Sequence, residues 1–171
     1  MFVQTDIFTL RPVREDEKQA VLEVYRLCED FLALTPKPIA TMQMVEDDLA
    51  ISRESGGVFC GIYNSEGVMM GILDVVLKGF GGDPDAAFIE LLMIGKPYRD
   101  HGLGSAIVKA IETEITKNSA IKAILSGVMV NNPDAVRFWT RHGYQIVAGP
   151  DLLADGTTVW SLKKQVSVKV N

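Results

Sequence analysis

Two nearly continuous apolar segments constrain the fold of this chain more than any other feature of its sequence. The segment Ala86–Ile94 contains a single charged residue, Glu90, and the segment Ile121–Val130 is similarly apolar. Such runs are typical of strands that are buried on both faces. Between them, Leu103–Lys117 repeats apolar side chains every three or four residues, which predicts a helix with one buried stripe. A helix that connects two buried strands indicates a mixed sheet, in the α/β or α+β class.

The remaining segments predict further strands and helices around this centre. Apolar and β-branched residues bounded by turn residues predict strands at 5–12, 57–63, 68–77, 144–147 and 157–162. Amphipathic spacing predicts helices at 15–31, at 42–53 and from Pro133 to about Gly143, where Asn132 is a suitable N-cap. We therefore expect a mixed central sheet of about six to seven strands, flanked by about four helices, in one domain spanning residues 1–171.

Composition and charge exclude several classes of protein. The 171 residues carry a net charge of −5, which argues against a nucleic-acid partner because such proteins usually present a basic patch. No apolar run approaches the roughly 20 residues that cross a bilayer, and a signal-peptide pattern is absent, so we expect no membrane partner. Cys28 and Cys60 form neither a disulfide framework nor a zinc-binding pair, which favours a reducing, cytoplasmic location. The two separated histidines, His101 and His142, predict no metal site.

The connection between the first apolar strand and the following helix predicts an anion site. Gly102 and Gly104 allow the backbone to turn tightly and to approach a ligand closely. The first turn of the helix presents unpaired N–H groups and the positive end of its dipole. Arg99 adds a permanent cation, so the segment is suited to bind a diphosphate.

Three interpretations of this glycine pair compete. It can be a strand-to-helix turn that binds no ligand, because short motifs have many false positives. A dinucleotide-binding fingerprint fits poorly, since Ile107 stands where a third glycine is expected and no acidic residue ends a second strand about 20 residues later. A P-loop is excluded because no Gly-Lys-Ser/Thr follows.

The remaining interpretation, after the plain turn and the dinucleotide-binding fingerprint, depends on two motifs together. The stretch RDHGLG, residues 99–104, resembles the R/Q-x-x-G-x-G/A signature of the GCN5-related N-acetyltransferase (GNAT) superfamily. The stretch NPDAVRFWTRHGY, residues 132–144, is similar to that family's second motif, N-x-x-A-x-x-L/F-Y-x-x-x-G-F. Both motifs occur in the family's order and spacing, and the resemblance extends from Thr5 to Leu162.

The resemblance implies a GNAT fold that binds acetyl-CoA. Family members hold the CoA pyrophosphate on backbone amides, which belong here to Arg99, Asp100, His101, Gly102, Leu103, Gly104 and Ser105. A splayed central strand pairs with the pantetheine arm, and its positions are held here by Leu92, Met93 and Ile94. Asn132 matches a side chain that hydrogen-bonds the pantetheine.

The candidate acid and base are less clearly marked. Glu90 is the candidate general base, because burial in an apolar strand raises a carboxyl pKa; alternatively it is a solvated strand-end residue or pairs with a lysine. Trp139 occupies the position of the family's usual tyrosine acid. An indole cannot serve as that acid, but it can donate a hydrogen bond or pack on the pantetheine. The thiolate therefore leaves unassisted, or Tyr98 or Tyr144 replaces the tyrosine.

The resemblance implies acetyl transfer to a primary amine, by direct attack in a ternary complex. The alternative is a catalytically silent acyl-CoA-binding module, which the tryptophan at position 139 favours. The acceptor, a small molecule or a peptide, would be selected by the first helices, by the connections around residues 30–45 and by the loops at 78–85 and 148–156. An acidic rim for a cationic acceptor, or simply solvated charge, is formed by Glu29, Asp30, Asp47 and Asp48. The tail Lys163–Asn171 predicts an extra strand, an intersubunit strand of a homodimer, or a frayed end.

Overall fold

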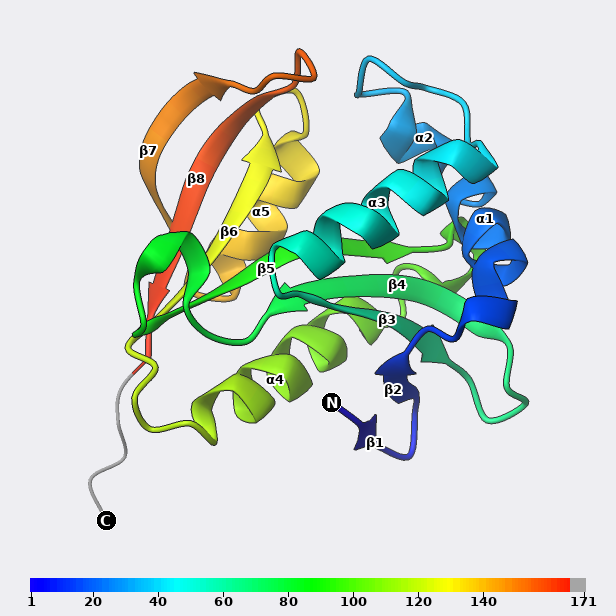
Figure 1. Ribbon diagram of the computed structural model, residues 1–171, viewed down its shortest axis with the longest axis horizontal. Coiled ribbons are helices and arrows are strands. Elements are labelled where there is room, and N and C mark those ends of the chain that lie inside the picture. Colours follow the sequence, from blue (N-terminus) through cyan, green and yellow to red (C-terminus); the bar gives the residue numbers. More distant parts are fainter. Residues whose placement is uncertain (167–171) are drawn as a thin grey trace.

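The computed structural model describes residues 1–166, which form one eight-stranded sheet with helices on both faces (Figure 1). The strands, in chain order, are β1 (Val3–Gln4), β2 (Thr9–Pro12), β3 (Val58–Tyr63), β4 (Met69–Val76), β5 (Ala86–Ile94), β6 (Ala123–Met129), β7 (Gln145–Leu152) and β8 (Thr158–Gln165). The α-helices are α1 (Lys18–Arg26), α2 (Glu29–Leu32), α3 (Met42–Glu54), α4 (Leu103–Thr116) and α5 (Pro133–Arg141). Short 3-10 turns are η1 (Glu15–Glu17), η2 (Phe80–Gly82) and η3 (Lys96–Tyr98).

The sheet is mixed, as the sequence predicts. Its strand order is β1-β2-β3-β4-β5-β6-β8-β7, and the β5–β6 pair, which α4 connects, is parallel while the other neighbours are antiparallel. The count of eight strands exceeds the expected six to seven because the N-terminal segment forms two strands. Thr5 ends the first of them, since its hydroxyl accepts hydrogen bonds from the N–H groups of Ile7 and Phe8 and turns the chain.

Two hydrophobic clusters cover the two faces of the sheet. The first contains the buried side chains of α4 together with Trp139 and Tyr144, and the second contains those of α1 with Leu32 and Val45. Alternate residues of the central strands enter one cluster or the other, as a sheet buried on both faces requires. Within residues 1–166, no helix combines the length and the apolar character needed to cross a membrane.

Strands β5 and β6 separate halfway along their length. Their pairing begins at Ala86 and Ala123 and ends at Ile89 and Ser126, whose hydroxyl donates to the carbonyl of Ile89 at 2.9 Å. Beyond this point β5 continues to Ile94 without pairing to β6. Figure 1 shows β6, β7 and β8 diverging from β5, with α5 beside the opening. The divergence exposes one edge of β5 in the middle of the sheet.

A β-bulge interrupts β5 at Glu90. Asp74 pairs with Leu91 and Val75 pairs with Ile89, so Glu90 has no partner on β4. One extra residue reverses the alternation of side chains along a strand. The apolar side chains before the bulge therefore enter the cluster of α4, whereas the next one after it packs toward α1 and α3.

Two expectations about element boundaries are wrong. The helix predicted at 15–31 is divided into η1, α1 and α2, because the Leu27 carbonyl accepts the backbone N–H of Lys96 and ties this point to the end of β5. The loop predicted at 148–156 is mostly strand. Register shifts around Gly149 and Pro150 let β7 continue past a residue that has no N–H. The first residues of the predicted tail extend β8, while residues 167–171 lie outside the described part of the chain.

Candidate active site

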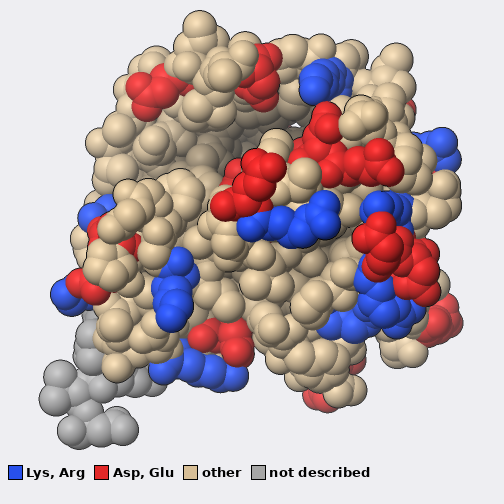
Figure 2. Space-filling view, in the orientation of Figure 1, with Lys and Arg blue, Asp and Glu red and all other residues tan. Residues whose placement is uncertain are grey.

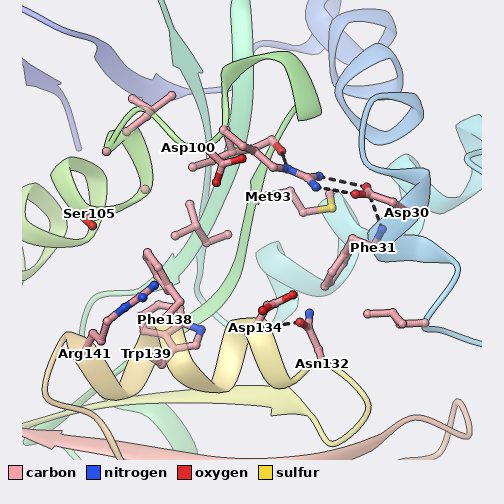
Figure 3. Close-up of a pocket in the computed structure, with 18 residues that line it drawn as sticks. Asp30, Phe31, Met93, Asp100, Ser105, Asn132, Asp134, Phe138, Trp139 and Arg141 are labelled. Carbon is pink, nitrogen blue, oxygen red and sulfur yellow. Dashed lines mark hydrogen bonds and ion pairs between the residues drawn. The ribbon is translucent and has the colours of Figure 1, made fainter.

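The opening between β5 and β6 contains a cavity of about 600 Å³, called here the α5 cavity (Figure 3). Its walls come from α2, the end of β5, the loop before α4, the first turn of α4, and α5. Nearly all of the predicted cofactor-binding residues line it: Leu92, Met93, Ile94, Arg99, Asp100, Gly102, Leu103, Gly104, Ser105, Asn132 and Trp139. His101 and Glu90 do not belong to the lining.

The loop before α4 presents unpaired N–H groups to this cavity. Asp100 and Gly102 adopt left-handed backbone conformations, with φ of 65° and 78°. No side chain caps α4, and no backbone N–H from Asp100 to Ser105 donates to another residue within the described chain. A Cβ on Gly104 would lie 3.3 Å from side-chain atoms of Ile94 and Phe138, so the absence of a side chain keeps this wall open. Such N–H groups at a helix N-terminus are suited to bind an anion.

The side chain of Arg99 is not a free cation. Its guanidinium donates to both carboxylate oxygens of Asp30, and its Nε donates to the carbonyl of Ile94 at 2.7 Å (Figure 3). The Arg99 guanidinium lowers the pKa of the Asp30 carboxyl, as expected for a bidentate ion pair. Arg99 therefore bridges α2 to the end of β5, and its role as a positive charge of the anion site stays a prediction.

A cation that the sequence analysis did not single out lies on α5. Arg141 lines the α5 cavity and has no ion-pair partner among residues 1–166. Its neighbour Arg137, by contrast, pairs with Asp134 on the same helix. The sequence could have indicated this position of Arg141, because Arg141 follows Phe138 by three residues and therefore lies on the same face of the helix.

Asn132 and Trp139 serve the local structure as well as the cavity wall. The Asn132 side chain accepts the N–H of Ala135 at 3.0 Å, which confirms it as the N-cap of α5. Trp139 is 6% exposed and packs edge-to-face against Tyr144, with ring centroids 4.8 Å apart. Burial raises the pKa of Tyr144, which, like Tyr98, does not line the α5 cavity. Neither tyrosine is therefore placed as a substitute acid.

A second cavity, called here the α3 cavity, has a volume of about 580 Å³ and lies between α1, α2, α3, β5 and the turn between β7 and β8. Phe31 and Met93 line both cavities, so the two meet at β5 and α2. Its wall carries more carboxylates than ammonium groups: Asp47, Asp48, Glu54 and Asp155 against Lys37. Figure 2 shows acidic side chains beside the central hollow of this face.

Glu90 lies outside both cavities, on the bulge of β5. The residue is exposed, yet partial loss of hydration raises the pKa of its carboxyl, and the nearby carboxylates of Asp74 and Asp48 raise it further. Asp74 is buried and accepts a hydrogen bond from the hydroxyl of Ser52 at 2.7 Å. A carboxyl with a raised pKa is suited to accept a proton near neutral pH.

A partly buried hydrogen bond at the α3 cavity was also missed by the sequence analysis. The hydroxyl of Tyr25, on α1, donates to Oδ2 of Asp48, on α3, at 2.6 Å. Tyr25 is fully buried, and Asp48 lines the cavity. Tyr25 follows Val21 by four residues, so its place on the apolar face of the helix could have indicated a buried polar contact.

The remaining candidates are structural. Cys28 and Cys60 are buried, as expected of core residues. Nδ1 of His142 lies 2.8 Å from the carbonyl of Phe138 at the end of α5, so this histidine makes a local structural contact. In the part of the chain that the structure describes, His, Cys, Asp and Glu side chains do not gather in threes where they could hold a metal ion.

The model of the acetyltransferase (GNAT) family matches residues 19–144, and the chain belongs to this family. A segment of 75 residues is 32% identical to N-alpha-acetyltransferase 60 of Xenopus tropicalis. This match covers 42% of the chain and 31% of that relative, so the chain spans about a third of the curated protein it matches.

Solved structures show the same fold. An acetyltransferase from Thermus thermophilus superposes with a TM-score of 0.78 at 21% identity, over 97% of this chain and 100% of that one. A spermidine N-acetyltransferase from Vibrio cholerae, in complex with CoA and spermine, superposes with a TM-score of 0.72 at 11% identity, over 98% and 100% of the two chains. These likenesses confirm the GNAT fold that the motifs imply.

Proposed function

We propose that the chain transfers the acetyl group of acetyl-CoA to a primary amine, by direct attack in a ternary complex within one domain. The observation that carries this proposal is the row of backbone N–H groups from Asp100 to Ser105, none of which donates to a residue in the described part of the chain. All of these residues except His101 line the α5 cavity. This row fits a diphosphate, and the cavity continues along the exposed edge of β5 toward a second cavity. Two substrates can therefore approach the same strand from two sides.

Acetyl-CoA supplies a thioester carbonyl, and the residues of the α5 cavity bind and orient it. The loop amides and Arg141 hold the phosphates, and the side-chain amide of Asn132 donates to the pantetheine. The backbone of Leu92–Ile94 pairs with the same arm along the edge that β6 leaves open. A free N–H at this edge stabilises the negative charge that develops on the carbonyl oxygen during attack.

In the transfer step the amine nitrogen forms a bond to the carbonyl carbon, and the bond from that carbon to sulfur breaks. Glu90 removes the proton of the attacking ammonium through a bridging water, because its side chain lies outside both cavities. After the attack the nitrogen releases its second proton to solvent. Trp139 cannot protonate the sulfur, so the leaving group departs as a thiolate. This is chemically accessible, since the pKa of a free thiol is about 8.5.

The relatives support an amine as the acceptor. The Vibrio cholerae structure is named for spermidine and contains spermine, and the Xenopus tropicalis relative is named for α-amino groups. Both names describe transfer of an acetyl group to nitrogen.

The alternative function is a silent acyl-CoA-binding module, which Trp139 favours because it replaces the usual tyrosine. Calorimetry with acetyl-CoA, followed by an assay of free thiol release with polyamines, aminoglycosides, amino acids and peptides, separates the two. Binding with thiol release supports the enzyme, whereas tight binding without release supports the module. If acetyl-CoA does not bind, or if Gly104→Trp leaves its binding unchanged, both proposals fail.

A further inference from the structure

The α3 cavity is placed to receive the acceptor. It reaches β5 on the face opposite α4, and it meets the α5 cavity at Phe31 and Met93. A molecule in the α3 cavity therefore approaches the same stretch of β5 that borders the α5 cavity. Its volume of about 580 Å³ is within the range of small-molecule sites, roughly 300–1,000 Å³.

The walls of this cavity divide into two kinds of surface. The part near β5 and α2 is apolar, with Leu91, Met93 and Phe31. The charged groups come from α3, from the turn before β8 and from Lys37, so they lie on elements other than the shared wall. If one amino group of an acceptor reaches the wall formed by Phe31 and Met93, the rest of the acceptor molecule would therefore lie beside the carboxylates.

Asp48 is the carboxylate of this wall whose position is most firmly set. Its Oδ2 accepts the hydroxyl of the fully buried Tyr25, whereas Oδ1 accepts no hydrogen bond from residues 1–166. Asp155 uses both oxygens to hold Thr157 in its own turn, and Asp47 accepts from Gln43. The pKa of Asp48 is raised by burial and by neighbouring carboxylates, and a bound cation would relieve both costs.

We propose that Asp48, oriented by Tyr25, binds a second ammonium group of the acceptor, and that the acceptor is a short linear alkane diamine or a longer molecule of the same kind. One amine reaches β5 and is acetylated, the methylene chain packs on the apolar wall, and the other amine stays charged at Oδ1 of Asp48. This inference rests on the proposed acetyl transfer. It adds Asp48 as a residue that determines specificity and Tyr25 as a positioning residue.

The test compares 1,4-diaminobutane with 1-aminobutane and with a short peptide that has a free N-terminus and no lysine. The wild-type chain should acetylate the diamine with a kcat/KM at least about 10-fold above that of either competitor. Asp48→Asn keeps the shape and should lower the diamine kcat/KM by roughly 10- to 100-fold, mainly through KM, as expected for one charged hydrogen bond. Tyr25→Phe should raise KM for the diamine and leave kcat unchanged.

Glu46→Gln is the matched control, because this exposed residue of α3 does not line the α3 cavity and the change removes the same charge. It should leave the diamine kcat/KM unchanged. Acetyl-CoA affinity and the melting temperature, measured for each variant, should stay near the wild-type values and so exclude misfolding. If the peptide or the monoamine reacts as well as the diamine, or if Asp48→Asn retains the wild-type KM, this inference fails while acetyl transfer stands. If no amine is acetylated, the proposed function fails with it.

Discussion

The guanidinium of Arg99 binds the carboxylate of Asp30 with two hydrogen bonds, at 2.6 and 3.1 Å, across 69 positions of sequence. The same side chain donates to the carbonyl at the end of β5, and Cys28 donates to that carbonyl as well. The residue that opens the glycine motif therefore fixes α2 over both cavities. It ties the wall that they share to the strand beneath it.

The Arg99 bridge predicts that Arg99→Lys weakens acetyl-CoA binding, by roughly 10-fold. A lysine ammonium cannot reproduce the planar fork that reaches two carboxylate oxygens and a carbonyl together. The loss of unfolding free energy should be no more than about 1 kcal/mol, because both partners are partly exposed. Calorimetry and thermal melting measure the two effects. Arg26→Lys, which alters an exposed pair with Glu23 away from both cavities, should change neither.

The cation on α5 predicts a salt-dependent contribution to cofactor affinity. Arg141→Gln should weaken acetyl-CoA binding by about 5- to 10-fold at low salt, and the difference from wild type should shrink as salt screens the charge. Titrations at two ionic strengths measure this effect. Arg137→Gln removes the same charge from the same helix but outside the cavity lining, so it should bind acetyl-CoA normally. If the two variants lose acetyl-CoA affinity equally, Arg141 makes no direct contact with the cofactor and the positive charge of α5 acts only at long range.

The carboxylates around the bulge predict the pH dependence of the reaction. Glu90 must be ionised to accept a proton, so kcat/KM should fall as the pH drops through its raised pKa. Asp74→Asn removes a negative charge that raises this pKa, and the acid limb should therefore move to lower pH. Glu90→Gln should abolish the limb and reduce kcat by about 100-fold.

Glu66→Gln provides the control for this pH prediction, because it removes an exposed charge from the turn between β3 and β4. Its pH profile should match that of the wild type. A Glu90→Gln variant that keeps the full rate across the whole pH range would remove Glu90 from the mechanism.

The left-handed conformation of Gly102, before α4, predicts that two glycine substitutions of similar effect on stability differ in their effect on acetyl-CoA binding. Gly102 and Gly67 have nearly equal positive φ, 78° and 79°, and among residues 1–166 no atom lies within 4 Å of a Cβ added to either. Replacing either with alanine should therefore lower the unfolding free energy by a similar amount, about 1 kcal/mol. Only Gly102→Ala should weaken acetyl-CoA binding, because relief of the strain moves the loop amides. If both variants bind acetyl-CoA with comparable affinity, the left-handed conformation of Gly102 is not needed for anion binding.

The sequence predicts the parts of the site that depend on local pattern. The buried strand, the two glycines and the following helix are encoded within about 30 consecutive residues, and the N-cap of α5 is encoded by Asn132 and Pro133. These features follow from periodicity, backbone freedom and capping, which act over a few residues.

The parts that the sequence did not predict depend on contacts between distant segments. The bulge at Glu90 is visible only against its partner strand, and the break after α1 depends on the bond from Lys96 to Leu27. The pair of Tyr25 and Asp48 joins two helices across 23 positions of sequence. Periodicity along one segment contains no information about which residue of another segment will face it.

The central claim is that an acetyl group passes directly from the α5 cavity to an amine in the α3 cavity. The most direct measurement uses acetyl-CoA labelled in its acetyl group, incubated with the chain and a panel of amines, with every product and the protein itself analysed by mass spectrometry. We predict label on the nitrogen of one amine, release of an equal amount of free CoA, and none on the protein. Label retained entirely on CoA despite tight binding, or found on the protein without an amine product, would contradict this claim.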